Sequence, residues 1–202
     1  MRAVLRFVAS VMMVSGALLI TDAAVTLLWQ EPISAVVAHR EQTRLKEALI
    51  NPPARVIHRM PLKGDAIARI EIPAIGVKDY VVEGTDVENL RKGPGHYPDT
   101  PLPGDRGTVA IAGHRTTYGA PFRKIDQLHH GQEIVLDMPY GRYVYRVERT
   151  KIVEPTDLSV LDKVRHDRLV LSACHPLYSA AQRIVVFSRL TKREPSRVRQ
   201  RS

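Results

Sequence analysis

The sequence predicts an all-β fold, a closed β-barrel or a β-sandwich with short helical turns, preceded by a transmembrane helix. Eight short runs rich in β-branched residues recur between positions 66 and 190, separated by turns that contain glycine or proline. That pattern is typical of barrels and sandwiches. Ahead of them, 17 of the 23 residues from Phe7 to Trp29 are apolar, and a helix of that length crosses a hydrocarbon core of about 30 Å.

The first predicted element is a membrane anchor over residues 1–29, which includes a short cytoplasmic stub. Arg2 and Arg6 precede the apolar run and a tryptophan ends it, as expected for a positive cytoplasmic flank and an interfacial aromatic residue. A cleaved signal peptide is the alternative, because Ala23 and Ala24 follow an apolar segment of suitable length. The run stays apolar after these alanines, which favours a retained anchor. We therefore expect a single-pass protein of the cell membrane whose main domain is extracytoplasmic.

Residues 30–64 are predicted to form an extracytoplasmic linker. Apolar residues spaced by three and four indicate a helix over 31–50, and the prolines that follow end it. The proline-containing segment 51–64 is typical of a tether. The globular domain is expected at 65–191 and a basic, disordered tail at 192–202.

Eight strands and two helical turns are expected inside the domain. The strands are 66–72, 80–83, 108–112, 133–137, 142–147, 152–153, 168–173 and 183–190, and the helical turns lie within 86–92 and 121–128.

The charge of the chain does not indicate a nucleic-acid partner. The formal net charge is +9, and residues 192–202 carry five Lys and Arg against one Glu, so 5 − 1 = +4 of it lies in the tail. No basic helix interleaved with aromatic residues occurs in the middle of the sequence. We therefore expect no binding to nucleic acid.

Three residues that could carry chemistry lie at the ends of predicted strands. Cys174 is the single cysteine, which excludes an internal disulfide and any metal site built from several thiolates. Cys174 and His114 each follow a strand, and Arg183 begins another. Because a barrel brings strand ends to one rim, we expect the three side chains to lie together. A buried thiol without a function is the alternative for an isolated cysteine.

These residue types fit acyl transfer. A thiolate is the nucleophile, and an imidazole takes its proton or protonates an amine leaving group. An arginine donor stabilises the negative charge that develops on the carbonyl oxygen, or it orients the substrate. His175 adjoins the cysteine, but successive strand residues face opposite sides, so His114 is the better base.

From about residue 66 to residue 190 the sequence resembles the sortases, the cysteine transpeptidases of Gram-positive cell surfaces. It is most similar to the class E housekeeping sortases of actinobacteria. The matching segments are 70–77 (IEIPAIGV), 82–85 (VEGT), 93–98 (GPGHYP), 110–122 (AIAGHRTTYGAPF), 171–176 (LSACHP) and 182–186 (QRIVV).

The resemblance implies an eight-stranded sortase-type barrel in which Cys174 is the nucleophile, His114 the catalytic histidine and Arg183 the substrate-orienting arginine. Tyr118 falls where class E enzymes have a tyrosine associated with preference for an L-A-x-T-G over an L-P-x-T-G sorting signal. His96 is expected to line the substrate groove as in relatives, and a loop residue without a function is the alternative.

The resemblance further implies cleavage of a C-terminal LPXTG- or LAXTG-like signal between Thr and Gly, through a thioacyl intermediate on the cysteine. The implied partners are secreted proteins that bear the signal, a lipid-linked peptidoglycan precursor whose amine accepts them, and the membrane that holds the N-terminal helix. We expect no cofactor. We also expect no metal, because the chain has no clustered acidic loop and the adjacent His129 and His130 lack further ligands.

The sequence also departs from the family pattern. The family motif T-L-x-T-C reads V-L-S-A-C at 170–174, which removes two hydroxyl groups near the site. Two other functions stay open. One is an L,D-transpeptidase-like peptidoglycan cross-linker, whose family usually has an arginine close after an S-x-G-C core. The other is a non-catalytic, surface-tethered binding module that kept the barrel.

Overall fold

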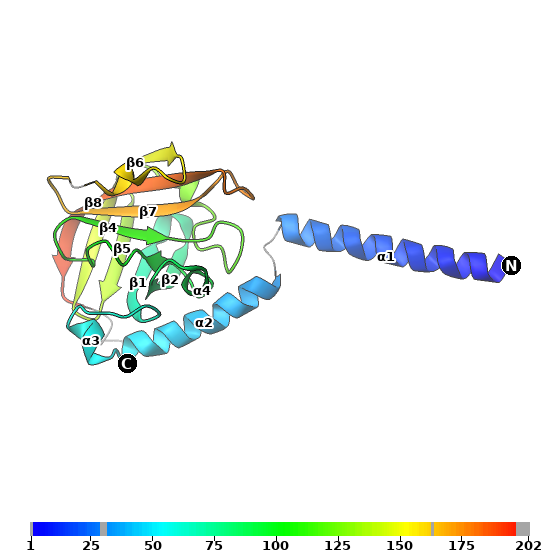
Figure 1. The fold of residues 1–202 in the computed structure, drawn as a ribbon, viewed down its shortest axis with the longest axis horizontal. Helices are drawn as coiled ribbons and strands as arrows, with labels where there is room; N and C mark the ends of the chain where they lie inside the picture. Colours follow the sequence, from blue (N-terminus) through cyan, green and yellow to red (C-terminus); the bar gives the residue numbers. More distant parts are fainter. Residues whose placement is uncertain (1, 29–31, 163, 197–202) are drawn as a thin grey trace.

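The computed structural model of the chain describes residues 2–28, 32–162 and 164–196. Its eight strands close into one barrel in the order β1-β2-β3-β4-β7-β8-β6-β5 (Figure 1). The strands are β1 (Ala66–Ile72), β2 (Val77–Glu83), β3 (Gly95–His96), β4 (Thr108–Ala112), β5 (Glu133–Met138), β6 (Gly141–Val153), β7 (Arg168–His175) and β8 (Gln182–Glu194). The α-helices are α1 (Arg2–Leu28), α2 (Pro32–Ile50), α3 (Ala54–Ile57) and α4 (Val87–Leu90), and the 3₁₀ turns are η1 (Pro73–Ile75), η2 (Ile125–Gln127) and η3 (Leu158–Leu161).

Side chains that alternate along each strand fill the barrel and leave a second set on its outer face. In β7, Leu169, Leu171 and Ala173 belong to the main core. Val170 belongs instead to a smaller apolar cluster on the outer face, which η3 covers with Leu161. The outer face of β7 is therefore partly covered around Val170.

Helix α2 is packed along the barrel (Figure 1). Leu45 and Leu49 are 5% and 1% exposed and join a cluster with Ala66 and Val82. The Gln42 side chain accepts a hydrogen bond from the Tyr80 N–H at 2.7 Å and donates to the Tyr80 carbonyl at 2.9 Å. The helix predicted over 31–50 is thus present, but it shares the core of the domain, whereas residues 30–64 were predicted to be a linker.

The segment after α2 is also folded onto the barrel. Val56 of α3 is 2% exposed, and the Arg55 guanidinium forms two hydrogen bonds with the Asp65 carboxylate, at 2.6 and 2.7 Å. The prolines at 52 and 53 therefore separate two packed helices and do not begin a loose tether.

Helix α1 extends away from the barrel (Figure 1). It is long and apolar enough to cross a membrane: its most apolar window, within Arg2–Val25, has a mean hydropathy of 2.1 and no buried residue. These properties fit a membrane anchor and fit a signal sequence equally well.

The closed barrel confirms the fold class, and several details differ from the sequence predictions. Strand β2 begins at Val77 and not at 80, and the 3₁₀ turns η1 and η3 were not predicted. The predicted strands 142–147 and 152–153 are one strand, β6, because irregular pairing with β8 carries it across the interruption. The two-residue strand β3 was missed, since a Gly-Pro-Gly segment gives no strand pattern. Strand β8 continues to Glu194, past the predicted start of the tail at 192, and residues 197–202 lie outside the described part of the chain.

Candidate active site

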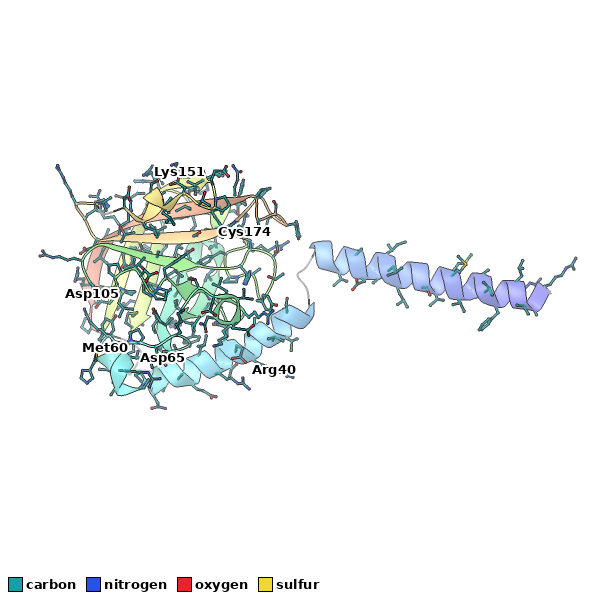
Figure 2. The ribbon with its side chains drawn as sticks, viewed as in Figure 1. Arg40, Met60, Asp65, Asp105, Lys151 and Cys174 are labelled. Atoms are coloured by element: carbon teal, nitrogen blue, oxygen red, sulfur yellow. The ribbon has the colours of Figure 1, made fainter. Side chains whose placement is uncertain are left out.

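The pairing of β4 with β7 brings the histidine and the cysteine to the same level. The two strands are parallel, and their last pair is Ala112 with Ser172. The next residue, Gly113, donates its N–H to the Ser172 carbonyl at 3.0 Å, so the pairing continues past the end of β4. His114 therefore follows at the level of Cys174, near the end of β7 and at the end of the barrel where α2 begins (Figure 2).

Arg183 lies across from the cysteine on the neighbouring strand. Strands β7 and β8 are antiparallel, and Cys174 and Arg183 are register partners. Side chains of such a pair point to the same face, with Cβ atoms about 5 Å apart. The sequence prediction that strand ends gather these residues thus agrees with the register of the barrel.

All three side chains belong to the outer face. Ala173 is part of the main core, so its neighbour Cys174 points outward. A Cβ on Gly113 would lie 2.5 Å from the buried Phe122 ring, so Gly113 faces inward. By the same alternation His114 points outward, and any side chain larger than hydrogen at 113 would displace the core.

His114 is half-buried, and its surroundings favour the neutral ring. Burial lowers the pKa of His114 below the ordinary value for histidine. The Thr117 hydroxyl lies 3.4 Å from His114 Nδ1. The described residues show no hydrogen bond between the ring and the Cys174 thiol, and a general acid or base needs to reach its partner only once the substrate is bound.

Arg183 keeps hydrogen-bond donors available for a ligand. Its Nη1 donates to the carbonyls of Ala180 and Gln182, at 2.9 and 3.0 Å. These bonds fix the guanidinium against the β7–β8 turn. The donors on Nε and Nη2 form no hydrogen bond within the described residues, so three of its five N–H groups remain for a carbonyl or carboxylate.

A small hollow adjoins Arg183 on the outer face. This proximal hollow has a volume of about 60 Å³, and its lining includes Arg183, Ser172, Val170, Val185, Ala110, Val153, Tyr97 and η3. Its lining is largely apolar, which suits an aliphatic side chain. Arg168 holds η3 over it, because its Nη2 donates to the carbonyls of Val160 and Asp162, each at 2.8 Å.

Tyr118 packs beside the histidine. The ring centroids of His114 and Tyr118 are 5.2 Å apart, and the Arg91 guanidinium carbon lies 5.7 Å from the centroid of the Tyr118 ring. The Tyr118 N–H donates to Ser34 Oγ of α2 at 3.2 Å. Helix α2 therefore contacts the loop that carries both rings.

His96 lies in the interior and not along a groove. It is 1% exposed, and its Nδ1 is 2.9 Å from a carboxylate oxygen of Glu83. Its Nε2 lies 3.1 Å from the Pro101 carbonyl and 3.1 Å from the Thr100 hydroxyl. These contacts tie β2, β3 and the loop before β4 together, so the side chain acts on the loop and does not meet a ligand.

Arg115 is a site residue that the sequence reasoning did not single out. It is 3% exposed, and its Nη1 donates to the Cys174 carbonyl at 3.3 Å. Its Nη2 pairs with the Asp126 carboxylate at 3.0 Å and donates to the Arg123 carbonyl at 3.3 Å. The sequence feature that could have identified Arg115 is the alternation of side chains. If His114 faces outward, Arg115 faces inward, and a buried guanidinium needs hydrogen-bond partners.

The described residues contain no group of three or more His, Cys, Asp and Glu that could hold a metal ion. His129 and His130 are exposed in the turn before β5, where His130 Nδ1 lies 3.1 Å from the Glu148 carbonyl oxygen.

Comparisons with known proteins give a consistent picture. A family model for the sortase domain matches residues 70–191. Sortase D of Bacillus subtilis is 34% identical over 134 residues, which cover 64% of this chain and 66% of the relative. Sortase SrtE1 of Streptomyces coelicolor is 25% identical over 206 residues, which cover 94% of this chain and 58% of the relative. The chain thus spans less than two thirds of the length of these relatives.

Solved structures share the same barrel. Sortase E from Streptomyces avermitilis superposes with a TM-score of 0.62 and 34% identity, covering 67% of this chain and 93% of that protein. The sortase D5 transpeptidase of Clostridium perfringens has a TM-score of 0.67 and 27% identity, covering 78% and 99%.

The lowered pKa of His114 predicts a stability change with pH. The unfolded chain takes up a proton near pH 6.5 and the folded chain only at lower pH. The free energy of unfolding should therefore decrease as the pH falls through this window and stop changing below the folded pKa. We expect His114→Asn to remove up to one proton from the pH slope, measured by urea unfolding of the full chain in detergent micelles.

His58→Asn, which changes an exposed histidine at the C-terminal cap of α3, is the matched comparison. Identical pH slopes for the wild type and His114→Asn would contradict this assignment of the histidine environment.

Proposed function

Because the chain belongs to the sortase family, we propose that it is a cysteine transpeptidase that cleaves a C-terminal sorting signal of the LPXTG or LAXTG kind between Thr and Gly. The acyl group would pass to the amine of a lipid-linked peptidoglycan precursor. The observation that carries the proposal is the pairing of Cys174 with Arg183 on one face, with His114 at the same level after β4.

The chemistry follows from these positions. His114 takes the proton of the Cys174 thiol, and the resulting thiolate attacks the threonine carbonyl. Arg183 donates to the substrate so that this carbonyl is oriented and its negative charge is stabilised. The C–N bond then breaks, and His114 protonates the departing glycine amine. The incoming amine attacks the thioester, loses a proton to His114 and releases the thiolate. The thioester retains the energy of the cleaved amide, so the reaction needs no nucleotide.

The proximal hollow supports a place for the leucine of the signal. An extended chain advances roughly 3.3 Å per residue, so the leucine lies about 10 Å from the threonine carbonyl. On β7, Val170 lies four residues before Cys174, which corresponds to about 13 Å. Val170 and Val185 line the proximal hollow, so its apolar lining falls where that side chain would arrive.

The proposal places α1 in the cell membrane as a single-pass anchor and the barrel outside it. The support is the length and hydropathy of α1, together with the two arginines at positions 2 and 6. Substrates would be exported proteins, and the acceptor would meet the site at the membrane surface. A signal sequence remains the alternative role of α1.

The main test is cleavage of two fluorogenic peptides, one with an L-A-x-T-G and one with an L-P-x-T-G signal. The full chain should cleave at least one, release the glycine segment, and hydrolyse its thioester when no amine is supplied. Cys174→Ala should abolish turnover, and Arg183→Ala should lower kcat/KM by about 10²–10³. Intact mass should show an acyl adduct on Cys174.

Folded Cys174→Ala or Arg183→Ala protein with full activity would overturn the proposed site. Absence of both cleavage and adduct with every signal would favour the non-catalytic binding module. Cross-linking of peptidoglycan stem peptides, without cleavage of sorting-signal peptides, would favour the L,D-transpeptidase-like alternative.

We further propose that Tyr118 selects alanine at the second position of the signal. The support is its ring, which lies 5.2 Å from that of His114. We expect Tyr118→Phe to lower the ratio of kcat/KM for the alanine over the proline signal about two- to fivefold, the effect of one hydrogen bond. Tyr178→Phe, which removes another hydroxyl from the β7–β8 turn, is the matched control, and an unchanged ratio in Tyr118→Phe would exclude this role.

We assign Arg115 as a positioning residue, since its bond to the Cys174 carbonyl fixes the backbone of the nucleophile. Arg115→Met should lower kcat about ten- to a hundredfold, because a displacement of about 1 Å can cost that much, with KM changed less than about twofold. Arg115→Lys should restore part of kcat. Asp126→Asn, which keeps the two bonds to carbonyls, is the control, and equal losses in kcat and thermal stability across all three variants would indicate a structural role alone.

A further inference from the structure

A second, larger hollow lies at the other end of the β4–β7 pair. This distal hollow has a volume of about 660 Å³, and Tyr97, Leu158, Leu161, Val164, Arg106 and Arg165 are among its lining residues. Thr108 and Asp167, at the beginning of β4 and just before β7, also border it. Neither the described catalytic residues nor α2 contribute to it.

The two hollows are neighbours along one groove. They share Tyr97, Leu158 and Leu161, so a chain that leaves the proximal hollow between these side chains enters the distal one. The outer face of β4 and β7 forms the floor of this path, and η3 and the loop around Tyr97 form its walls.

The wall made by η3 is fixed by polar contacts, several of them partly buried. Besides the bonds from Arg168 to η3, the Thr108 hydroxyl donates to the Asp162 carbonyl at 3.2 Å. The Asp157 carboxylate accepts the Ser159 N–H at 3.0 Å and caps η3. A groove whose wall segments are fixed in position is a preorganised binding surface, and preorganisation lowers the entropy lost on binding.

The distance between the distal hollow and Cys174 follows from the rise per residue along β7. Asp167 lies seven residues before Cys174, which corresponds to about 23 Å of extended chain. Consider an extended substrate whose threonine carbonyl lies at the Cys174 thiol. The residues about 23 Å away are then the sixth and seventh before the threonine, which are the third and fourth before the leucine of the signal. The distal hollow is therefore placed for the polypeptide that precedes the signal.

The lining indicates which side chains fit there. Its apolar part, with Leu158, Leu161 and Val164, would bury a large apolar side chain. Its charged part is positive. Within the described residues neither Arg106 nor Arg165 has an ion-pair partner, and the negative charge of Asp99 in the same lining balances only one of these two positive charges. The Asp167 carboxylate is already paired with Arg193 at 2.7 Å.

We propose that the distal hollow is an extended substrate site that binds the segment three or four residues before the sorting signal and prefers a large apolar residue next to a carboxylate. The inference rests on the proposed function for the identity of its ligand. The substrate would thus be selected by its upstream sequence as well as by the signal.

The test uses four peptides with one sorting signal and different residues four and three positions before its leucine: Phe-Glu, Phe-Lys, Ser-Glu and Ser-Ser. Kd is measured on the Cys174→Ala full chain in detergent micelles, so that binding does not depend on turnover. We expect Phe-Glu to bind about five- to twentyfold more tightly than Ser-Ser. The same order should appear in kcat/KM with the wild-type chain.

Three variants assign the preference to the hollow. Combined Arg106→Glu and Arg165→Glu should make Phe-Lys the better ligand of the two Phe peptides, by about two- to fivefold. Val164→Trp, which fills the hollow, should remove the advantage of Phe over Ser. Arg40→Glu, which makes the same substitution at one position on α2 (Figure 2), should retain the wild-type order.

Equal Kd values for the four peptides, with the signal still cleaved, would overturn the inference and leave the proposed function standing. The expected order of Kd values without cleavage of any peptide would overturn the proposed function and support the hollow as a peptide-binding site. An unchanged order in the arginine and Val164 variants would also overturn the inference, because the preference would then arise elsewhere.

Discussion

The parallel pairing of β4 with β7 is the constraint on which the site depends. The two strands are separated in sequence by β5 and β6 and have no local reason to meet. Their register puts His114 at the level of Cys174, and a slip by one residue would turn Cys174 toward the core. The register is fixed because Val109, Ile111 and Leu171 are buried in one cluster, so the energy of the core sets the level of His114 relative to Cys174.

Buried polar side chains, in addition to the strand register, position the segments around the candidate site. Arg115, Arg168 and His96 are at most 6% exposed, and each contacts a backbone carbonyl of another segment. A buried ionic group adds little net stability when an apolar side chain of the same volume could replace it. Each of the three positions a segment of backbone: Arg115 that of Cys174, Arg168 that of η3, and His96 that of the loop before β4.

The sequence predicted the strands with regular alternation and the residues at their ends, since both depend on local patterns. The positions of Cys174, His114 and Arg183 on one rim followed from strand boundaries alone. The interior place of His96 did not, because a Gly-Pro-Gly-His segment carries no periodicity and its partner Glu83 lies on another strand. The distal hollow could not be predicted either, since it is formed by segments around residues 97–108 and 158–167 that meet only in the folded barrel.

The sequence predicted helix α2 but not its packing against the barrel, which has a physical cause. Strand β3 pairs with β2 only at Val82 and Glu83, so the outer edge of β2 before these residues has no strand beside it. Unpaired backbone groups at a sheet edge are costly to bury and prone to pair with another chain. Gln42 supplies one donor and one acceptor to Tyr80, as a neighbouring strand would.

The same helix reaches the site at its other end. Ser34 accepts the Tyr118 N–H, and Tyr118 packs on His114. The segment between α1 and the barrel is thus bound both to the open edge of β2 and to the loop beside His114. Hydrogen bonds and buried leucines therefore determine how the site is placed relative to α2. The contacts that cover the edge of β2 also determine the orientation of this helix, which follows α1 in the chain.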